Sequence, residues 1–148
     1  MANIITAPAD VAVSGFKVYL GGAIDMGQAE DWQTTLAHLL QDEKDLVLIN
    51  PRRPDFSPEH FDEQVLWELD AMEKADCVLM WFPAASKAPI ALLESGLYMR
   101  SGKLLIGAEP DYYRRRNLEL TTQHHGVRLW SDLGEIAEAI KRLYHNRA

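Results

Sequence analysis

Short apolar runs along this chain alternate with longer segments in which apolar residues recur every three or four positions. The runs have the length of β-strands, and the third of them is continuously apolar, as expected of a strand covered by helices on both faces. The longer segments have the spacing of amphipathic helices. The alternation predicts an α/β fold, a flavodoxin-like or Rossmann-like three-layer sandwich around a mostly parallel, five-stranded sheet. The expected strands span residues 16–20, 46–49, 77–82, 104–106 and 126–129.

Four segments carry the helical pattern, at residues 28–40, 60–75, 89–99 and 131–144. Pro89 suits the first turn of the third helix, and Ser131 is expected to cap the last one. In the second helix the periodic apolar positions are Phe61, Val65, Leu69 and Met72.

The remainder of the chain adds little regular structure to this pattern. Residues 1–15 are expected to be extended, with a short apolar run at Asn3–Thr6 that could form an edge strand. No internal repeat, linker or low-complexity tract divides the sequence. We therefore predict a single domain spanning residues 1–148.

Charge and cysteine content narrow the function classes. The formal net charge of −7 argues against a partner such as duplex nucleic acid, which requires a basic binding face. The single cysteine, Cys77, lies within a predicted buried strand and is expected to be structural. No basic segment leads into a long apolar run near Met1, and no window has the length of a membrane span, so we expect a cytoplasmic protein without a membrane partner.

Two carboxylates on predicted helices lie close in sequence to the central apolar strand. Glu94 has Ile90 four positions before it and Leu97 three positions after it, so it lies on or beside the stripe expected to face the core. An ionised carboxylate there is costly unless it is paired or functional. Asp70 could pair with Lys74 on a solvated helix face, or serve a site. Since ligands of open α/β sheets bind at the carboxyl ends of the strands, both carboxylates are candidates for cleaving a glycosidic bond.

The other polar and glycine motifs are less specific. Gly21-Gly22 follows the first core strand, where it permits either a tight turn or the approach of a ligand to the backbone. The arginines at 52–53 and 114–116 could hold an anion, although solvated loops are favoured for most of them. The histidines lack the spacing of metal ligands, and the nucleotide-binding glycine fingerprints are absent, so we expect neither a metal nor a cofactor.

Several blocks in order across residues 16–120 resemble the nucleoside 2-deoxyribosyltransferase family and its nucleotide N-glycosidase relatives. The blocks are Val18-Tyr19-Leu20-Gly21-Gly22-Ala23-Ile24, Asn50-Pro51-Arg52-Arg53, Trp67-Glu68-Leu69-Asp70 through Phe82-Pro83, Leu93-Glu94-Ser95-Gly96, and a weaker one from Glu109-Pro110 to Asn117-Leu118. This resemblance implies a flavodoxin-like fold and a small-molecule nucleoside or nucleotide substrate.

The resemblance also assigns roles to individual residues. Glu94 is similar to the nucleophile that attacks the anomeric carbon, and Asp70 to the carboxylate that assists it. Tyr19 is similar to the aromatic residue of the first core strand that touches the nucleophile or the ligand. Asn117 resembles an asparagine that reaches a neighbouring subunit's site, which implies a homo-oligomer with shared sites. Substrate contacts are expected from Gly21, Gly22, Asp25, Trp81, Pro83, Ser86 and Asn117.

Two departures from the family pattern leave the substrate open. Residues 86–89 hold no carboxylate, whereas the transferases carry one just before the nucleophile to grip the base. Asp25 stands near the glycine turn, where the hydrolases tend to place an arginine and serines for a 5′-phosphate. Three hypotheses remain: an enzyme that transfers a pentosyl group between bases, an N-glycoside hydrolase, and a non-catalytic nucleotide- or ADP-ribose-binding module.

Overall fold

The computed structural model describes residues 2–24, 30–54 and 57–147, which form one parallel sheet flanked by helices. The sheet has six strands in the order β1-β3-β2-β4-β5-β6. Without β1 this order is the flavodoxin-like 2-1-3-4-5 arrangement, so the predicted fold is confirmed. The strands are β1 (Asn3–Thr6), β2 (Phe16–Gly22), β3 (Leu46–Asn50), β4 (Cys77–Phe82), β5 (Leu104–Ala108) and β6 (Leu129–Trp130).

The sheet has one strand more than the five expected, because Asn3–Thr6 pairs with β3 as an edge strand. The last strand is shorter than residues 126–129 suggested. Gly126 adopts a φ of +69°, and the N–H of Val127 donates to the Thr122 carbonyl, so the chain is still turning out of the preceding helix there. Pairing with β5 begins only at Leu129.

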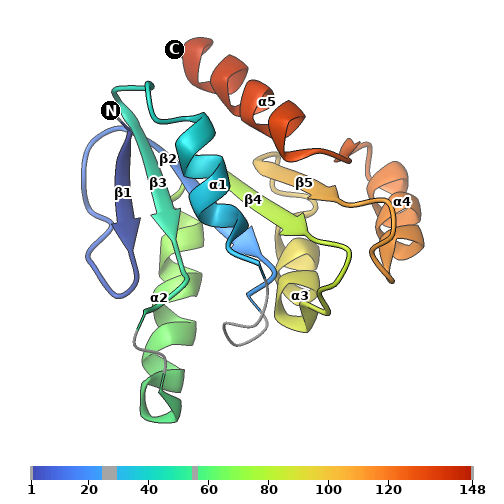
Figure 1. Ribbon diagram of the computed structural model, residues 1–148, viewed down its shortest axis with the longest axis horizontal. Helices are drawn as coiled ribbons and strands as arrows, with labels where there is room; N and C mark the ends of the chain where they lie inside the picture. Colours follow the sequence, from blue (N-terminus) through green and yellow to red (C-terminus); the bar gives the residue numbers. More distant parts are fainter. Residues whose placement is uncertain (1, 25–29, 55–56, 148) are drawn as a thin grey trace.

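Helices cover both faces of the sheet (Figure 1). Apolar side chains of α1 and α5 pack on one face, and those of α2, α3 and α4 pack on the other. None of the helices within the described residues is long and apolar enough to cross a membrane. The helices are α1 (Trp32–Leu39), α2 (Phe61–Lys74, preceded by the 3₁₀ turn η2, Pro58–His60), α3 (Pro89–Tyr98), α4 (Arg115–His124) and α5 (Leu133–His145).

Two helix starts differ from the sequence prediction, and one helix, α4, was not predicted at all. Asp132, rather than Ser131, caps α5, since its carboxylate accepts the N–H of Glu135. Asp31 caps α1 in the same way through the N–H of Thr34, which places the helix start at Trp32; residues 28 and 29 lie outside the described part of the chain. The arginines at 115 and 116 begin α4 instead of lying in a loop.

Several large apolar side chains of α2 and α3 face outward rather than toward the core. Phe61, Val65 and Leu69, predicted as the buried stripe of α2, are 58%, 38% and 40% exposed. The buried positions of this helix are Gln64, Ala71 and Met72, of which only Met72 belonged to the predicted stripe. On α3 the outward positions are Ile90, Leu93 and Leu97. We call these six exposed apolar residues the outer apolar face.

The strand order reverses between β2 and β4, which lie side by side at the centre of the sheet. From β2 the chain turns to β3 on one side, whereas β4 continues to β5 on the other. Open α/β sheets leave a crevice at the carboxyl ends of the strands where the order reverses. Here those ends are Gly22 of β2 and Phe82 of β4, and α3 follows directly after β4.

Candidate active site

Glu94 is buried on the inner side of α3, against the central strands. Only 7% of the residue is exposed, and its buried neighbours on the helix are Ala91 and Ser95. The expected burial is therefore found, although the reason given for it was wrong. Ile90 and Leu97, which were taken to mark the core stripe, point outward, and Glu94 lies among small residues that let α3 approach the sheet.

The carboxyl group that meets Glu94 belongs to Glu68 of α2. The two side chains share a hydrogen bond. Glu68 is held from its other side by Gln64, one helical turn earlier, whose amide Nε2 donates to Glu68 Oε2 at 2.8 Å. The same amide nitrogen donates to the Pro51 carbonyl at 2.9 Å, so the loop after β3 fixes the position of Gln64. Glu68 was not among the site residues predicted from the sequence.

Burial raises the pKa of both carboxyl groups, and their contact raises the pKa of Glu94 further. Burial is the main cause for Glu94, the negative charge of Glu68 adds to it, and together they raise the pKa of Glu94 to about 8. Burial likewise raises the pKa of Glu68, while hydrogen bonds from Gln64 and Glu94 partly offset this rise. Because two ionised carboxylates offer acceptors only, the hydrogen bond between them requires a proton. The pair therefore holds one proton near neutral pH.

Tyr19 of β2 lies beside this pair. The residue is 1% exposed, and burial together with the charges of Glu68 and Glu94 raises the pKa of its phenol well above the ordinary value. Its ring extends along the strand toward Gly21, since a Cβ built on Gly21 would lie 2.9 Å from the Tyr19 ring. Tyr19 therefore enters the site as a neutral phenol, between the carboxyl pair and the carboxyl end of β2.

Asp70 is not brought to the site. Its side chain is 55% exposed and pairs with Lys74 at 2.9 Å on the solvent side of α2. Residues two positions apart on a helix lie on nearly opposite faces. Since Glu68 faces α3, Asp70 has to face away from it, and the position expected for Asp70 is taken by Glu68.

Gly21 and Gly22 allow β2 and β4 to approach closely at the crevice. Gly22 adopts a φ of +118°, and a Cβ there would lie 2.2 Å from the carbonyl oxygen of Trp81. A Cβ on Gly21 would meet the thioether of Met80 at 2.6 Å. Both glycines therefore have a structural requirement of their own, whatever they contact in a complex.

The residues expected at the end of β4 are divided between two places. Trp81 points to the opposite face of the sheet from Glu94, where it packs with the side chains of α1 and α5, and its buried indole N–H has no hydrogen-bond partner in the part of the chain described. Pro83 and Ser86 form a buried turn leading into α3, in which the Ser86 hydroxyl donates to the Pro83 carbonyl at 2.7 Å.

The start of α3 is fixed by contacts from the next loop of the sheet. The Tyr112 hydroxyl donates to the Lys87 carbonyl at 2.6 Å, and the Tyr112 ring packs on Phe82 with centroids 5.0 Å apart. Ala88 adopts the left-handed φ of +55° immediately before Pro89, a conformation that non-glycine residues rarely take. These contacts hold the orientation from which α3 directs Glu94 toward Tyr19.

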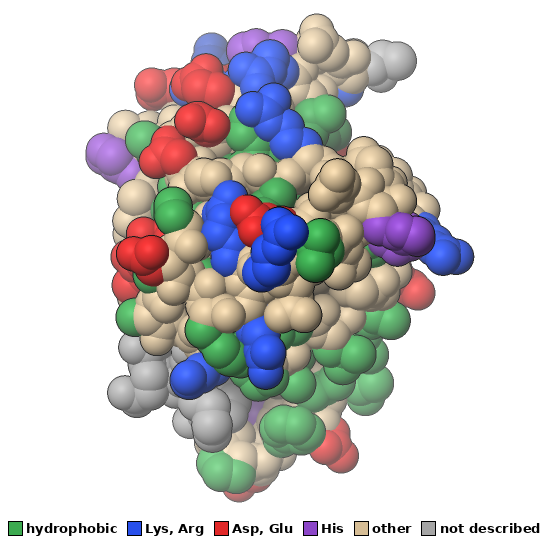
Figure 2. Space-filling view, turned by 90° about the vertical axis from the view of Figure 1, so that its right-hand side faces the viewer, with side chains coloured by type: hydrophobic (Ala, Val, Ile, Leu, Met, Phe, Trp, Pro, Cys, Tyr) green, Lys and Arg blue, Asp and Glu red, His purple; other side chains and the backbone are tan. Residues whose placement is uncertain are grey.

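The last two candidate residues, Asn117 and Asp25, are not placed at the carboxyl pair. Asn117 is exposed on α4, and Asp25 lies outside the described residues. Figure 2 shows the α4 side of the molecule, where basic side chains surround acidic ones. Arg115 and Arg116 both pair with Glu119 on this helix, at 3.6 and 3.5 Å, so neither is held free for an anion.

The sequence did contain a signal for Glu68. Ala71, Met72 and Ala75, the small and medium apolar residues of α2, stand three, four and seven positions after it. All three are buried, so Glu68 shares their stripe. The larger residues Phe61, Val65 and Leu69 shifted the predicted stripe toward the neighbouring, exposed side of the helix.

The site places three functional groups beside the carboxyl end of β2. They are the carboxylate and the carboxylic acid of the Glu68–Glu94 pair and the neutral phenol of Tyr19. One carboxyl group can attack an electrophilic carbon while the other supplies a proton to the leaving group. Within the described residues, no basic side chain forms an ion pair with Glu68 or Glu94, and no cluster of three or more potential metal ligands occurs. With one proton, the pair carries a single negative charge instead of two.

Comparison with known proteins identifies the family of this chain. A search of curated proteins finds no match. A family model described as nucleoside 2-deoxyribosyltransferase like matches residues 15–112, a span that contains Tyr19, Glu68 and Glu94 but not Asn117. The matched span runs from the start of β2 to the loop after β5 and so covers most of the sheet and the whole carboxyl pair. The chain therefore belongs to the nucleoside 2-deoxyribosyltransferase-like family.

Proposed function

We propose that the protein cleaves the N-glycosidic bond of a nucleoside, with Glu94 as nucleophile and Glu68 as the proton donor. The observation that carries this proposal is the buried, hydrogen-bonded pair of carboxyl groups, which holds one proton between two acids. A pair of carboxyl groups with distinct protonation states is what glycosidic cleavage requires. Family membership supplies the nucleoside as the substrate class.

In the proposed first step, the proton of the pair passes from Glu94, whose pKa is raised to about 8, to Glu68 as the substrate binds. The Glu94 carboxylate then attacks the anomeric carbon while the bond from that carbon to the base nitrogen breaks. The electron pair of this bond stays with the base, which takes the proton from Glu68. A glycosyl ester on Glu94 and a free base result. Tyr19, a neutral phenol beside both carboxyl groups, is suited to stabilise the carboxylate of Glu94 before attack.

In the second step, Glu68, now ionised, takes a proton from the acceptor as the acceptor attacks the anomeric carbon and releases Glu94. A second base as acceptor gives a new nucleoside, and water gives free sugar. Exclusion of water from the site decides between these outcomes. Transfer and hydrolysis are both consistent with the proposed mechanism, and their products distinguish them.

The test is an incubation of the purified protein with a 2′-deoxynucleoside, first alone and then with a second free base. Chromatography measures free base and any new nucleoside. We expect base release or exchange by the parent protein and a loss of at least about a thousandfold in Glu94→Gln, since the amide cannot form the ester. Undiminished turnover by Glu94→Gln would overturn the proposal. Binding of the nucleoside without any product would favour the non-catalytic hypothesis.

We further propose that the protein functions as a homo-oligomer whose subunits associate through the outer apolar face. Ile90, Leu93 and Leu97 of α3 are between 58% and 63% exposed, and Phe61, Val65 and Leu69 continue the apolar surface on α2. The two helices lie on the same side of the sheet and meet through the Glu68–Glu94 contact. Contiguous apolar surface of this kind is typical of an interface. A self-complementary patch satisfies the two-fold symmetry of a dimer.

A further inference from the structure

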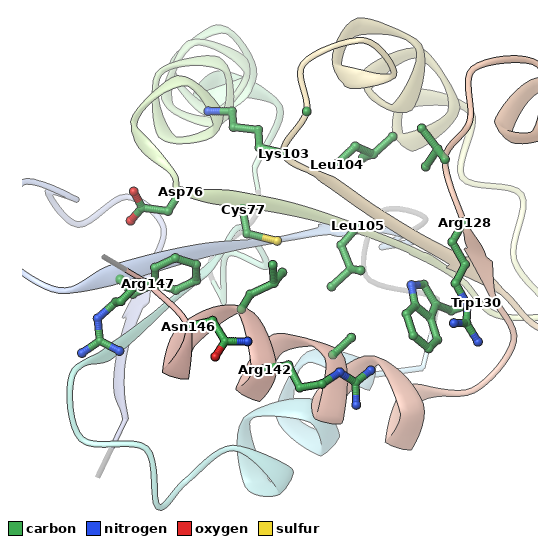
Figure 3. A pocket seen from close by; sticks show the side chains of 15 residues that line it. Asp76, Cys77, Lys103, Leu104, Leu105, Arg128, Trp130, Arg142, Asn146 and Arg147 are labelled. Atoms are coloured by element: carbon green, nitrogen blue, oxygen red, sulfur yellow. The ribbon is translucent and has the colours of Figure 1, made fainter.

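A hollow among the described residues lies away from the carboxyl pair, on the opposite face of the sheet. This α5 pocket has a volume of about 660 Å³ and lies between the amino ends of β4 and β5 and the last turns of α5 (Figure 3). Its floor includes Cys77, Leu105 and Trp130, and α5 contributes Ala139 and Leu143. Because the sheet separates it from Glu94, the α5 pocket is no part of the nucleoside site.

The floor of the α5 pocket is apolar, and its rim is basic. In Figure 3, Cys77 and Leu105 point from the strands into the hollow. Burial raises the pKa of the Cys77 thiol to about 12, so this side chain stays neutral. Arg128, Arg142 and Arg147 line the same pocket, in a chain whose formal net charge is −7. Three guanidinium groups thus gather around an apolar surface.

Two of these arginines lack an acidic partner. Arg147 pairs with Asp45 at 3.7 Å, but no described carboxylate pairs with Arg128 or Arg142. Arg128 lies over the Trp130 ring, 3.8 Å from its centroid, which holds the guanidinium flat against the pocket wall.

The other charged side chains that line the pocket, Lys103 and Asp76, form hydrogen bonds with the backbone. Lys103 donates to the carbonyls of Met72 and Ala75 at the end of α2, both at 2.8 Å. Asp76 accepts the backbone N–H of Lys17 at 2.8 Å. Neither group offsets the positive charge of Arg128 and Arg142, so the net charge of the rim remains positive.

We propose that the α5 pocket binds a small carboxylate with an apolar body, its carboxylate held by Arg128 and Arg142 and its body on the floor. Guanidinium groups bind carboxylates through paired hydrogen bonds. The volume lies within the range of sites for small ligands, which combine an apolar lining with a few polar groups. The site goes beyond the proposed nucleoside chemistry and does not depend on it.

The probe is decanoate, followed by NMR of the indole N–H signals in the 15N-labelled full chain. Each of the four tryptophans gives one indole N–H signal, and the signal that is missing in Trp130→Phe is the one from the pocket. We expect a saturable shift of the Trp130 signal, with the signal of Trp67, on α2, unmoved. Arg128→Gln and Arg142→Gln should each weaken binding about tenfold. Decanol, which lacks the charge, should bind at least about tenfold more weakly than decanoate.

Arg116→Gln is the matched control, because it removes the same charge from the exposed surface of α4, where the side chain is 76% exposed. It should bind decanoate as the parent does. The proposal is overturned if the Trp130 signal does not shift, if decanol binds as tightly as decanoate, or if Arg128→Gln and Arg142→Gln bind like Arg116→Gln. All of these measurements are independent of nucleoside turnover.

Discussion

At the scale of single residues, Glu68 and Asp70 provide a matched test of the site. They are two acidic residues two positions apart on α2, one against Glu94 and the other 55% exposed beside Lys74. Glu68→Gln should lower nucleoside turnover by about a hundredfold or more, because the amide cannot donate an acidic proton to the leaving base. Asp70→Asn should change turnover by no more than about twofold, since it removes only an exposed ion pair. Equal losses in the two variants would contradict the assignment of Glu68.

The raised pKa of Glu94 makes stability depend on pH in a defined direction. Its pKa is about 8 in the folded protein against an ordinary value of 4.5, so between these values the folded state keeps a proton that the unfolded state has released. The free energy of unfolding should therefore fall as pH rises from about 5 to about 8, at no more than about 1.4 kcal/mol per pH unit for one group.

Urea unfolding of the parent protein and of Glu94→Gln at several pH values in this window measures the effect. The glutamine variant should lose most of the slope, because it keeps a neutral side chain at all pH values. Asp70→Asn serves as the control and should retain the slope of the parent. An unchanged slope in Glu94→Gln would show that Glu94 ionises in the folded protein as it does in the unfolded chain.

The residue scale also shows where sequence reasoning reached its limit. Glu94 and Tyr19 could both be found from the resemblance, whereas the apolar neighbours that suggested the burial of Glu94 turned out to be exposed. Glu68 could not be separated from Asp70, because both lie on the same helix and only the rotation of α2 about its axis distinguishes them. That rotation is set by packing of Ala71 and Met72 on the sheet, and the exposed large residues of α2 suggested a rotation centred on the neighbouring side of the helix.

At the scale of elements, the end of β2 depends on one glycine. Gly22→Ala should lower the free energy of unfolding by roughly 2–4 kcal/mol, because a Cβ at a φ of +118° is strained and would overlap the Trp81 carbonyl at 2.2 Å. Gly96→Ala on α3 is the contrasting substitution, since a Cβ there meets nothing within 4 Å. It should raise stability by roughly 0.5–1 kcal/mol through helix propensity. Thermal or urea unfolding measures both, and a Gly22→Ala protein as stable as the parent would refute the strain.

The elements themselves were largely predictable, because strand and helix patterns depend on local periodicity. Their exact boundaries were less so. The end of α4 at His124 and the short β6 depend on the turn at Gly126, and the start of α5 depends on whether Ser131 or Asp132 supplies the cap. Two alternative start or end residues of a helix differ in free energy by about the contribution of one hydrogen bond. A difference of this size cannot be recognised in the pattern of apolar and polar residues.

At the scale of the whole molecule, the outer apolar face and Asn117 connect the site to assembly. The large residues of this face shifted the predicted stripes of α2 and α3 away from the sides that the core buries. A second copy of the chain would bury Leu93 and Leu97 at the interface. Interface residues are apolar for the same reason as core residues, so the sequence pattern of an interface helix resembles that of a core helix. The double variant Leu93→Ser with Leu97→Ser should therefore reduce the oligomer measured by sedimentation. Leu120→Ser, on the similarly exposed Leu120 of α4, should not.

Shared sites can then be tested by mixing two inactive proteins. If Asn117 of one subunit serves the Glu94 of another, Glu94→Gln and Asn117→Ala each lose activity alone. A dimer of one copy of each contains one intact site, made from Glu94 of the second variant and Asn117 of the first. Random exchange between subunits should thus restore about a quarter of the parent sites. Introducing Leu93→Ser and Leu97→Ser into both proteins should abolish this recovery, because the subunits no longer meet. Mixed dimers without recovered turnover would show that Asn117 acts within its own subunit or not at all.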